Sequence, residues 1–410
     1  MSELEYNRRK RKRKMENSLC KVPFTGFYIG PTGNIVLCCM SQDTHLAHIN
    51  NVDDLESFYN DSIMEKYRKG LVLGAYSTMK PCDNCYHMEV QQLKQFKVQM
   101  DNHFKFKNFD NDWNARLNNE TRPIRFLEYT LSNICNADCA TCKSEWSSKW
   151  QEIDKKFGRK VTPLQKVEDK HISKIEKVLY GLEYLVVKGG EPFADIRNIR
   201  ILKKLTEVNP KCQINIVSNF HAITPEAMDI LANLTNVHFI ASIDAVTPET
   251  YKWIRGGNIE KTIANMKNIY KLTGNKISVN VTISLYNYFL LDKIKDFFKN
   301  KEYIKTVDFS SFAPEEDHTV GLLPEYMYNK QKDKLTKAFA NHNNHDYYLC
   351  GTQAIKVDYE KIRRPSYDGN LADQQWMKDK FFHTLDKMNE HRGFDLCDYV
   401  PELKEWRINT

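Results

Sequence analysis

Long apolar runs are absent from this sequence. No stretch approaches the length of a membrane-spanning helix, and the N-terminal residues contain no apolar core of a signal peptide. A soluble cytoplasmic protein is therefore expected. Because the cytoplasm is reducing, the 11 cysteines are not expected to form a disulfide framework. Their clustering indicates metal binding instead.

Net positive charge is nearly absent outside one segment. The formal net charge is +7, and the run RRKRKRK, Arg8 to Lys14, supplies seven positive charges by itself. The rest of the chain is close to neutral, which argues against a broad nucleic-acid-binding groove. Such a run can bind phosphates non-specifically, so nucleic acid stays a candidate partner of the tail. We favour a solvated, disordered terminus.

A fourth cysteine is missing from the tightest cysteine group. The segment ICNADCATCK places Cys135, Cys139 and Cys142 within eight residues. Three thiolates suit a four-iron cubane that leaves one iron open for a substrate, as catalytic zinc sites keep one position free. A structural zinc site is the alternative, but it needs a fourth ligand, and no His or Cys follows closely.

After Pro123, apolar strands alternate with amphipathic helices. Hydrophobic residues make up 41% of the chain, which allows a substantial core. The predicted strands are residues 125–133, 182–192, 213–220, 237–245, 277–285 and 306–314. Continuous Val- and Ile-rich strands separated by helices indicate a parallel sheet. The predicted fold class is therefore α/β, with a partial (β/α)6 TIM-like barrel.

A small cysteine-rich α+β module precedes this barrel, and a helical C-terminal extension follows it. The module contains a predicted hairpin, residues 26–37. The predicted domains are a basic disordered tail at 1–17, the module at 18–100, a linker at 101–122, the barrel at 123–320 and the extension at 321–410. Thr-Pro pairs at Thr162, Thr224 and Thr247 predict helix N-termini with Thr as the cap.

Polar clusters stand where the predicted strands end. The three cysteines follow the first strand. The other clusters are Gly189, Gly190 and Glu191 after the second strand, Ser218 and Asn219 after the third, and Ser242 and Asp244 at the end of the fourth. Because active sites of such barrels lie at the carboxyl ends of the strands, all of these residues are predicted to share one rim.

Over residues 123–315 these motifs resemble the radical S-adenosylmethionine (SAM) superfamily. CxxxCxxC follows the first strand, and KGGEP at 188–192 resembles the segment that holds the methionine amino group of SAM. VSNF at 217–220 resembles the strand-three motif, with Phe220 where glycine is often found. SIDAVTPETYKWIRGG at 242–257 resembles the strand-four segment of the peptide-modifying branch. Thr141 stands where the family usually has an aromatic residue near the adenine.

The resemblance implies an activity and a set of cofactor-binding residues. Cys135, Cys139 and Cys142 would hold a [4Fe–4S] cluster whose open iron binds SAM. Reductive cleavage of SAM would yield a 5′-deoxyadenosyl radical that abstracts hydrogen from a substrate, with electrons from a donor such as flavodoxin or ferredoxin. The residues implied to contact SAM are Gly189, Gly190, Glu191, Ser218, Asn219, Ser242, Asp244 and Arg255. For Asp244, a role as a helix cap is weighed equally.

The second cysteine group comprises Cys20, Cys38, Cys82 and Cys85. Its spacing resembles the SPASM and twitch accessory modules of the same superfamily, here placed before the barrel. The resemblance implies one fully ligated auxiliary cluster, expected to be [4Fe–4S], that transfers electrons. A zinc ribbon built from the same four thiolates is the alternative. Cys39 is expected to be a buried spare thiol.

The sequence does not identify the substrate. Twitch and SPASM relatives often modify peptides or proteins, so a polypeptide is the first expectation, and small molecules and nucleotides stay open. No catalytic acid, base or hydrogen donor is assigned, and no membrane partner is expected. The competing hypothesis is a zinc-stabilised nucleic-acid-binding protein. The basic run and the two cysteine groups support it, whereas the KGGEP segment and the near-neutral body argue against it.

Overall fold

The structure is a computed structural model that describes residues 20–39, 41, 44–73, 75, 78–80, 82–83, 120–161, 167–312, 316–340 and 371–408. The predicted basic tail, most of the predicted linker, Cys85 and Thr162 lie outside the described residues. The chain divides into two compact units. The first comprises Met1–Ser132, Leu164–Val187 and Arg197–Ile214, and the second comprises Asn133–Pro163, Lys188–Ile196 and Asn215–Thr410.

The first unit contains a mixed sheet with the strand order β3-β2-β1-β4-β5. These strands are β1 (Gly26–Ile29), β2 (Asn34–Val36), β3 (Ala47–His48), β4 (Phe126–Tyr129) and β5 (Tyr184–Val187). Its helices are α2 (Val22–Thr25), α3 (Leu55–Tyr59), α4 (Ser62–Val72), α9 (Ile172–Val178) and, apart from its first residue, α10 (Ile196–Val208). Strands β1, β4 and β5 run parallel, and all their residues are buried.

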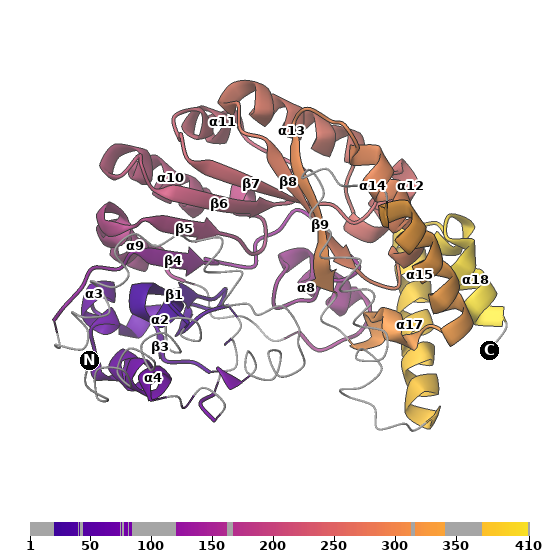
Figure 1. Cartoon of the computed structure of the whole chain (residues 1–410), viewed down its shortest axis with the longest axis horizontal. Coiled ribbons are helices and arrows are strands. Elements are labelled where there is room, and N and C mark those ends of the chain that lie inside the picture. The colour runs from indigo at the N-terminus through magenta and orange to yellow at the C-terminus, as the bar shows by residue number, and fades with distance from the viewer. Residues whose placement is uncertain are drawn as a thin grey trace, which may run out of the picture. The chain divides into compact units, whose positions relative to one another are not determined.

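The second unit carries most of β6 (Gln213–Ser218), followed by β7 (Val237–Ser242), β8 (Ile277–Ile283) and β9 (Ile304–Phe312) in that spatial order. Strand β8 runs parallel to both β7 and β9. The helices are α8 (Ser148–Lys156), α11 (Pro225–Ala232), α12 (Pro248–Arg255), α13 (Ile259–Thr273), α14 (Leu291–Phe298), α15 (Glu325–Ala340), α17 (Leu371–Arg392) and α18 (Pro401–Ile408). Helix α11 packs beside α13, and α12 contacts α17 (Figure 1).

The predicted α/β fold class is confirmed, because each of the six predicted segments overlaps a strand and the pairs β4–β5, β7–β8 and β8–β9 are parallel. Helix α11 begins where the Thr-Pro pair predicts, and the Thr224 hydroxyl accepts a hydrogen bond from Ala227 N at 3.1 Å. Thr247 is the N-cap residue of α12, but its hydroxyl contacts the Thr250 hydroxyl instead of the helix backbone.

The predicted hairpin is also present, but its first strand has a second partner. Strands β1 and β2 pair antiparallel around a turn in which Gly33 has a φ of +84°. Strand β1 also pairs parallel with β4, with Gly26 opposite Phe126. A Cβ atom on Gly26 would lie 1.6 Å from the Phe126 carbonyl oxygen, so this register requires glycine. The cysteine-rich module thus extends the sheet of the first barrel strand.

Within the part of the chain that the structure describes, no helix combines the length and the apolar character needed to cross a membrane.

Candidate active site

The three cysteines Cys135, Cys139 and Cys142 lie in a loop, residues 133–143, which we call the cysteine loop. It contains no helix or strand, and all three side chains are partly accessible. Burial raises the pKa of the Cys135 thiol to about 12, and it also raises the pKa of Cys139 and Cys142. Free thiols here are therefore neutral at pH 7, and a bound metal cation would have to displace their protons.

Side chains from the start of helix α8 hold this loop. Ser147 is the N-cap residue of α8, yet its hydroxyl accepts no hydrogen bond from the helix backbone and instead donates to the Ala137 carbonyl oxygen at 3.0 Å. The Trp150 indole Nε1 donates to the Cys139 carbonyl oxygen at 2.6 Å. These bonds satisfy carbonyl groups that an irregular loop would otherwise leave unpaired.

The GGEP segment packs directly against the cysteine loop. Gly189 and Gly190 have φ values of +85° and +49°, a region that favours glycine. A Cβ atom on Gly190 would lie 2.2 Å from the Ile134 carbonyl oxygen, and that same oxygen accepts a hydrogen bond from Glu191 N at 2.7 Å. Glycine at this position therefore permits a close backbone approach next to Cys135.

Glu191 connects this segment to the end of β6. Its carboxylate accepts hydrogen bonds from the Ser218 hydroxyl at 2.7 Å, Asn219 N at 2.7 Å and Phe193 N at 3.2 Å. Burial raises its pKa to about 7, although the hydrogen bonds oppose that shift. A carboxylate can accept about four hydrogen bonds, so capacity for one more donor remains. A cation at that position would favour the ionised form.

Asn219 links the Glu191 carboxylate to the cysteine loop. Its Nδ2 donates to Asn136 Oδ1 at 2.8 Å and lies 4.0 Å from Cys135 Sγ. The next residue, Phe220, is fully buried and has a φ of +57°, which non-glycine residues rarely adopt. Phe220 occupies the position at which glycine is common in the resembling family, and its backbone has the conformation that glycine favours.

Arg255, the last residue of α12, is buried beside the cysteine loop. Its Nη1 donates to Asp244 Oδ2 at 2.8 Å, and Asp244 Oδ1 accepts from Thr282 N at 2.7 Å. Both Asp244 oxygens are thus engaged within the protein, and Asp244 does not cap α12, which begins at the N-cap Thr247. Arg255 Nε is buried without a hydrogen-bond partner among the described residues. An acceptor on a ligand would remove that unfavourable burial, worth about 1–3 kcal/mol.

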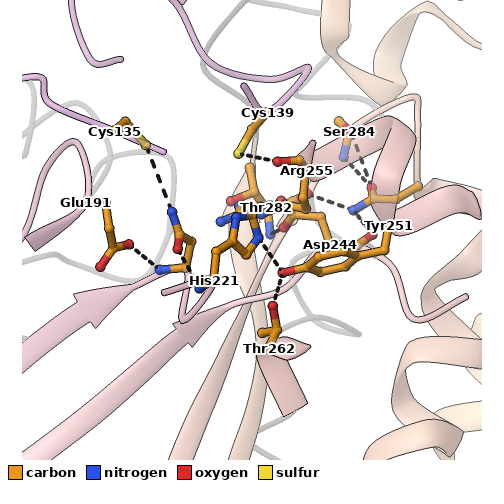
Figure 2. Close-up of polar contacts among 12 residues, drawn as sticks. Cys135, Cys139, Glu191, His221, Asp244, Tyr251, Arg255, Thr262, Thr282 and Ser284 are labelled. Carbon is orange, nitrogen blue, oxygen red and sulfur yellow. Dashed lines mark hydrogen bonds and ion pairs between the residues drawn. The ribbon is translucent and has the colours of Figure 1, made fainter. Parts of the chain in front are cut away.

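The predicted rim residues do not all touch one another. Glu191, Ser218 and Asn219 form one hydrogen-bonded group. Asp244 and Arg255 form a second group, and the Arg255 carbonyl oxygen lies 3.7 Å from Cys139 Sγ (Figure 2). Ser242 is the last residue of β7, is half-buried and contacts neither group through a described hydrogen bond.

The sequence-based reasoning missed His221, which follows the VSNF segment. Its Nε2 lies 2.9 Å from the Tyr251 hydroxyl, which in turn lies 3.2 Å from Thr262 Oγ1 (Figure 2). Burial, aided by the positive charge of Arg255, lowers the pKa of His221 to about 3, so its imidazole is neutral. The one feature of the sequence that could have identified His221 as a site residue is its position directly after the VSNF motif.

In the first unit, the described cysteines of the second group pack against two apolar clusters, each of which contains a residue of helix α2. Cys20 and Cys38 pack against the apolar cluster that contains Val22, whereas Cys82 packs against the cluster that contains Phe24. Val22 and Phe24 both belong to α2. Cys85 lies outside the described residues.

The donors of the cysteine loop fit an iron–sulfur cluster. The loop carries three free, partly accessible thiols, Gly190 lets the GGEP backbone approach Ile134 next to Cys135, and Arg255 Nε is an unpaired donor. Among the described residues, no three His, Cys, Asp or Glu side chains converge as the ligands of one metal ion would. A cubane takes its thiolates on separate iron corners, so its ligands need not converge on one point.

Replacing Gly190 by alanine is expected to damage this site through a collision. The change Gly190→Ala should lower the free energy of unfolding by about 2–4 kcal/mol, because an overpacking cost adds to the strain of a positive φ. Gly158→Ala is the matched control, since Gly158 has a φ of +73° but no atom lies within 4 Å of the position that its Cβ would take. It should lose only about 1 kcal/mol. Equal losses in denaturant titrations would contradict the collision.

Comparison with known proteins finds a family match for each of the two cysteine-bearing segments. The family model described as "Radical SAM superfamily" matches residues 129–300. The model of the SPASM family, described as "Iron-sulfur cluster-binding domain", matches residues 20–86. The first match contains the cysteine loop and the GGEP segment, and the second contains all four cysteines of the second group.

Individual relatives are distant. A probable GTP 3′,8-cyclase of Methanococcus aeolicus is 26% identical over 283 residues, which cover 62% of this chain and 89% of the relative. A protein of the same description from Methanocaldococcus jannaschii is 25% identical, with coverage of 62% and 88%. Among solved structures, Streptococcus suis SuiB bound to its precursor peptide SuiA aligns with a TM-score of 0.42 at 14% identity, over 78% of this chain and 70% of SuiB.

The two family matches fall on the two cysteine groups and on the strand-end motifs between Glu191 and Arg255. Residues 129–300 therefore carry a radical SAM domain and residues 20–86 an iron–sulfur cluster-binding domain of the SPASM type, and the two matches identify an enzyme with a [4Fe–4S] cluster, an auxiliary iron–sulfur cluster and SAM as its cofactor.

Proposed function

We propose that this enzyme cleaves SAM at a cluster held by Cys135, Cys139 and Cys142, and that the reaction modifies a peptide or protein. The observation that carries the assignment of the cleavage site is the buried, unpartnered Nε of Arg255 next to the cysteine loop. A polar donor in that position needs an acceptor. The carboxylate of the methionine part of SAM would supply one.

The protein's own groups bind and orient the cofactor in this proposal. Glu191 offers its remaining acceptor position to the methionine amino group, and its ionised form is favoured by that cation. Asp244 fixes the Arg255 guanidinium through a 2.8 Å ion pair and so acts as a positioning residue. When bound, the cluster and SAM supply the electron transfer and the radical chemistry.

The auxiliary cluster is proposed to bind to Cys20, Cys38, Cys82 and Cys85. Four thiolates would ligate it completely, which favours electron transfer over substrate binding. The external electron donor is proposed to be a small redox protein such as flavodoxin or ferredoxin. No residue of the described chain is assigned as the donor's docking surface.

Two substrate classes are supported by different observations. The SPASM match supports a polypeptide, because accessory modules of this kind often accompany peptide modification. The curated relatives support a nucleotide, because they are described as probable GTP 3′,8-cyclases. We place the polypeptide first, since the strand-four segment around Asp244 and Arg255 resembles that of the peptide-modifying branch.

Removing one thiol from the cysteine loop should abolish SAM cleavage. In the anaerobically reconstituted and reduced enzyme, Cys142→Ala is expected to lower the rate of 5′-deoxyadenosine release by at least about 100-fold, because a cluster with two protein ligands is poorly held. Cys212→Ala is the matched control, since Cys212 is buried elsewhere in the chain and lies in neither cysteine group. Release at the wild-type rate by Cys142→Ala would refute the ligand assignment.

Loss of the second cysteine group should leave the first cluster in place. The double variant Cys20→Ala/Cys38→Ala is expected to reduce the iron content from about eight to about four atoms per chain. Cleavage of SAM with a chemical reductant should continue, because the cysteine loop is unchanged. Zinc bound to the wild-type chain at this group, with only about four iron atoms, would support the zinc-ribbon alternative.

Hydrogen transfer can distinguish the two substrate classes. If the genome encodes a short peptide beside this gene, that peptide in fully deuterated form should pass deuterium into 5′-deoxyadenosine when a polypeptide is the substrate. Deuterated GTP should pass none. Transfer from GTP together with none from the peptide would reverse the order of the two proposals, and mass spectrometry of the released nucleoside provides the measurement.

A further inference from the structure

The last turn of helix α17 reaches the cysteine loop. Arg392, the final residue of α17, donates from Nη1 to Asp138 Oδ2 at 2.6 Å and from Nη2 to the Asp138 carbonyl oxygen at 2.8 Å. Its Nε donates to the Trp253 carbonyl oxygen at 3.0 Å. All three guanidinium nitrogens are thus engaged, and the side chain is only 6% exposed. Asp138 directly precedes Cys139.

We propose that Arg392 and Asp138 are positioning residues of the active site. Arg392 fixes the cysteine loop against α12, and the opposite charges of the pair together set the electrostatic potential at the cluster next to Cys139. This inference rests on the proposed function, because it assumes a cluster held by the cysteine loop.

The geometry requires a guanidinium. A planar fork can donate to two oxygens of Asp138 and still donate to a third acceptor on α12, whereas a lysine ammonium is a point charge that cannot reproduce this pattern. Helix α12 also touches the loop directly, since Ala140 N donates to the Ile254 carbonyl oxygen at 2.7 Å. Arg392 therefore joins the loop to the same helix that ends at Arg255.

The surroundings of Asp138 are shaped to admit its carboxylate. Gly256 has a φ of +71°, and a Cβ atom there would lie 1.5 Å from Asp138 Oδ1 and 3.2 Å from Arg392 Nη2. His391 Nε2 lies 3.0 Å from Asp138 Oδ2, the oxygen that also accepts from Arg392 Nη1. The loop residue is thus enclosed by α12 and α17, and only glycine at 256 leaves space for it.

The two charges should affect the cluster in opposite directions. Reduction adds negative charge to the cluster, so a nearby cation raises its reduction potential and a nearby anion lowers it. If the pair only positioned the loop, by contrast, removing either partner would shift the reduction potential in the same direction. Neutral substitutions at Asp138 and Arg392 therefore separate an electrostatic role from a merely structural one.

The test uses the full-length enzyme with both clusters, prepared anaerobically. The variants are Arg392→Gln, Asp138→Asn and the double variant, and redox titrations follow by electron paramagnetic resonance the signal that changes when SAM is added. We expect a lower potential for Arg392→Gln, a higher one for Asp138→Asn and a near-native one for the double variant. All three should weaken SAM binding by about 10- to 100-fold, the usual effect of removing an outer partner of a metal site.

Two further variants control for folding and charge. Arg407→Gln removes another arginine–aspartate pair of the C-terminal helices, in which Arg407 Nη1 lies 2.8 Å from Asp386 Oδ1, and should leave potential and SAM affinity unchanged. Arg392→Lys keeps the charge but loses the fork, so it should retain the potential and still weaken SAM binding. Should Arg392→Gln fail to fold by circular dichroism, Asp138→Asn and Arg392→Lys decide the question.

The outcomes distinguish the inference from the function on which it rests. A wild-type enzyme without a SAM-responsive cluster signal would overturn the proposed function, and the inference with it. A normal wild-type signal, combined with unshifted potentials or with shifts of the same sign in Arg392→Gln and Asp138→Asn, would overturn the inference alone.

Discussion

The buried carboxylate of Glu191 is the interaction on which the rest of the site depends. The carboxylate accepts hydrogen bonds from two residues at the end of β6, Ser218 and Asn219. The backbone N of Glu191 donates to the Ile134 carbonyl oxygen. One residue thus joins the end of β6, through its side chain, to the segment that leads into Cys135, through its backbone. Because it is buried, with a pKa raised to about 7, removing any of these donors would leave the carboxylate poorly solvated.

The cysteine loop has no regular structure, so partners outside it must fix its shape. Helix α8 contributes Ser147 and Trp150, and α12 contributes carbonyl oxygens near Ala140 and Cys139. Each of these bonds goes to a backbone group or thiol of the loop. Such an arrangement preorganises the thiols for a cofactor, and the entropy of ordering the loop is lost on folding instead of on binding.

Local patterns in the sequence predict much of this fold and part of the site. Strands such as β4 and β5 are continuous apolar runs, and the cysteine, GGEP and VSNF motifs lie at strand ends. The strands and these motifs could therefore be predicted from the sequence alone. Contacts between distant residues leave no such pattern. Strand β1 pairs with β4 across about a hundred residues, and Arg392 meets Asp138 from a separation of 254 residues. Asp244 also looked like a cofactor ligand or a cap, because only the fold brings Arg255 and Thr282 to its two oxygens.

Phe220 raises the question of how a bulky residue can occupy a backbone conformation that favours glycine. A strained φ of this kind costs about 1–3 kcal/mol. Burial of a phenylalanine side chain contributes about 1.5–3 kcal/mol, and its edge contacts with Phe193 and Phe239, at centroid distances of 6.5 and 6.3 Å, each add about 0.5–1.5 kcal/mol. The packing therefore offsets the strain. Because Phe193 follows the GGEP segment and Phe220 follows Asn219, the same aromatic contact reinforces the connection that Glu191 makes by hydrogen bonding.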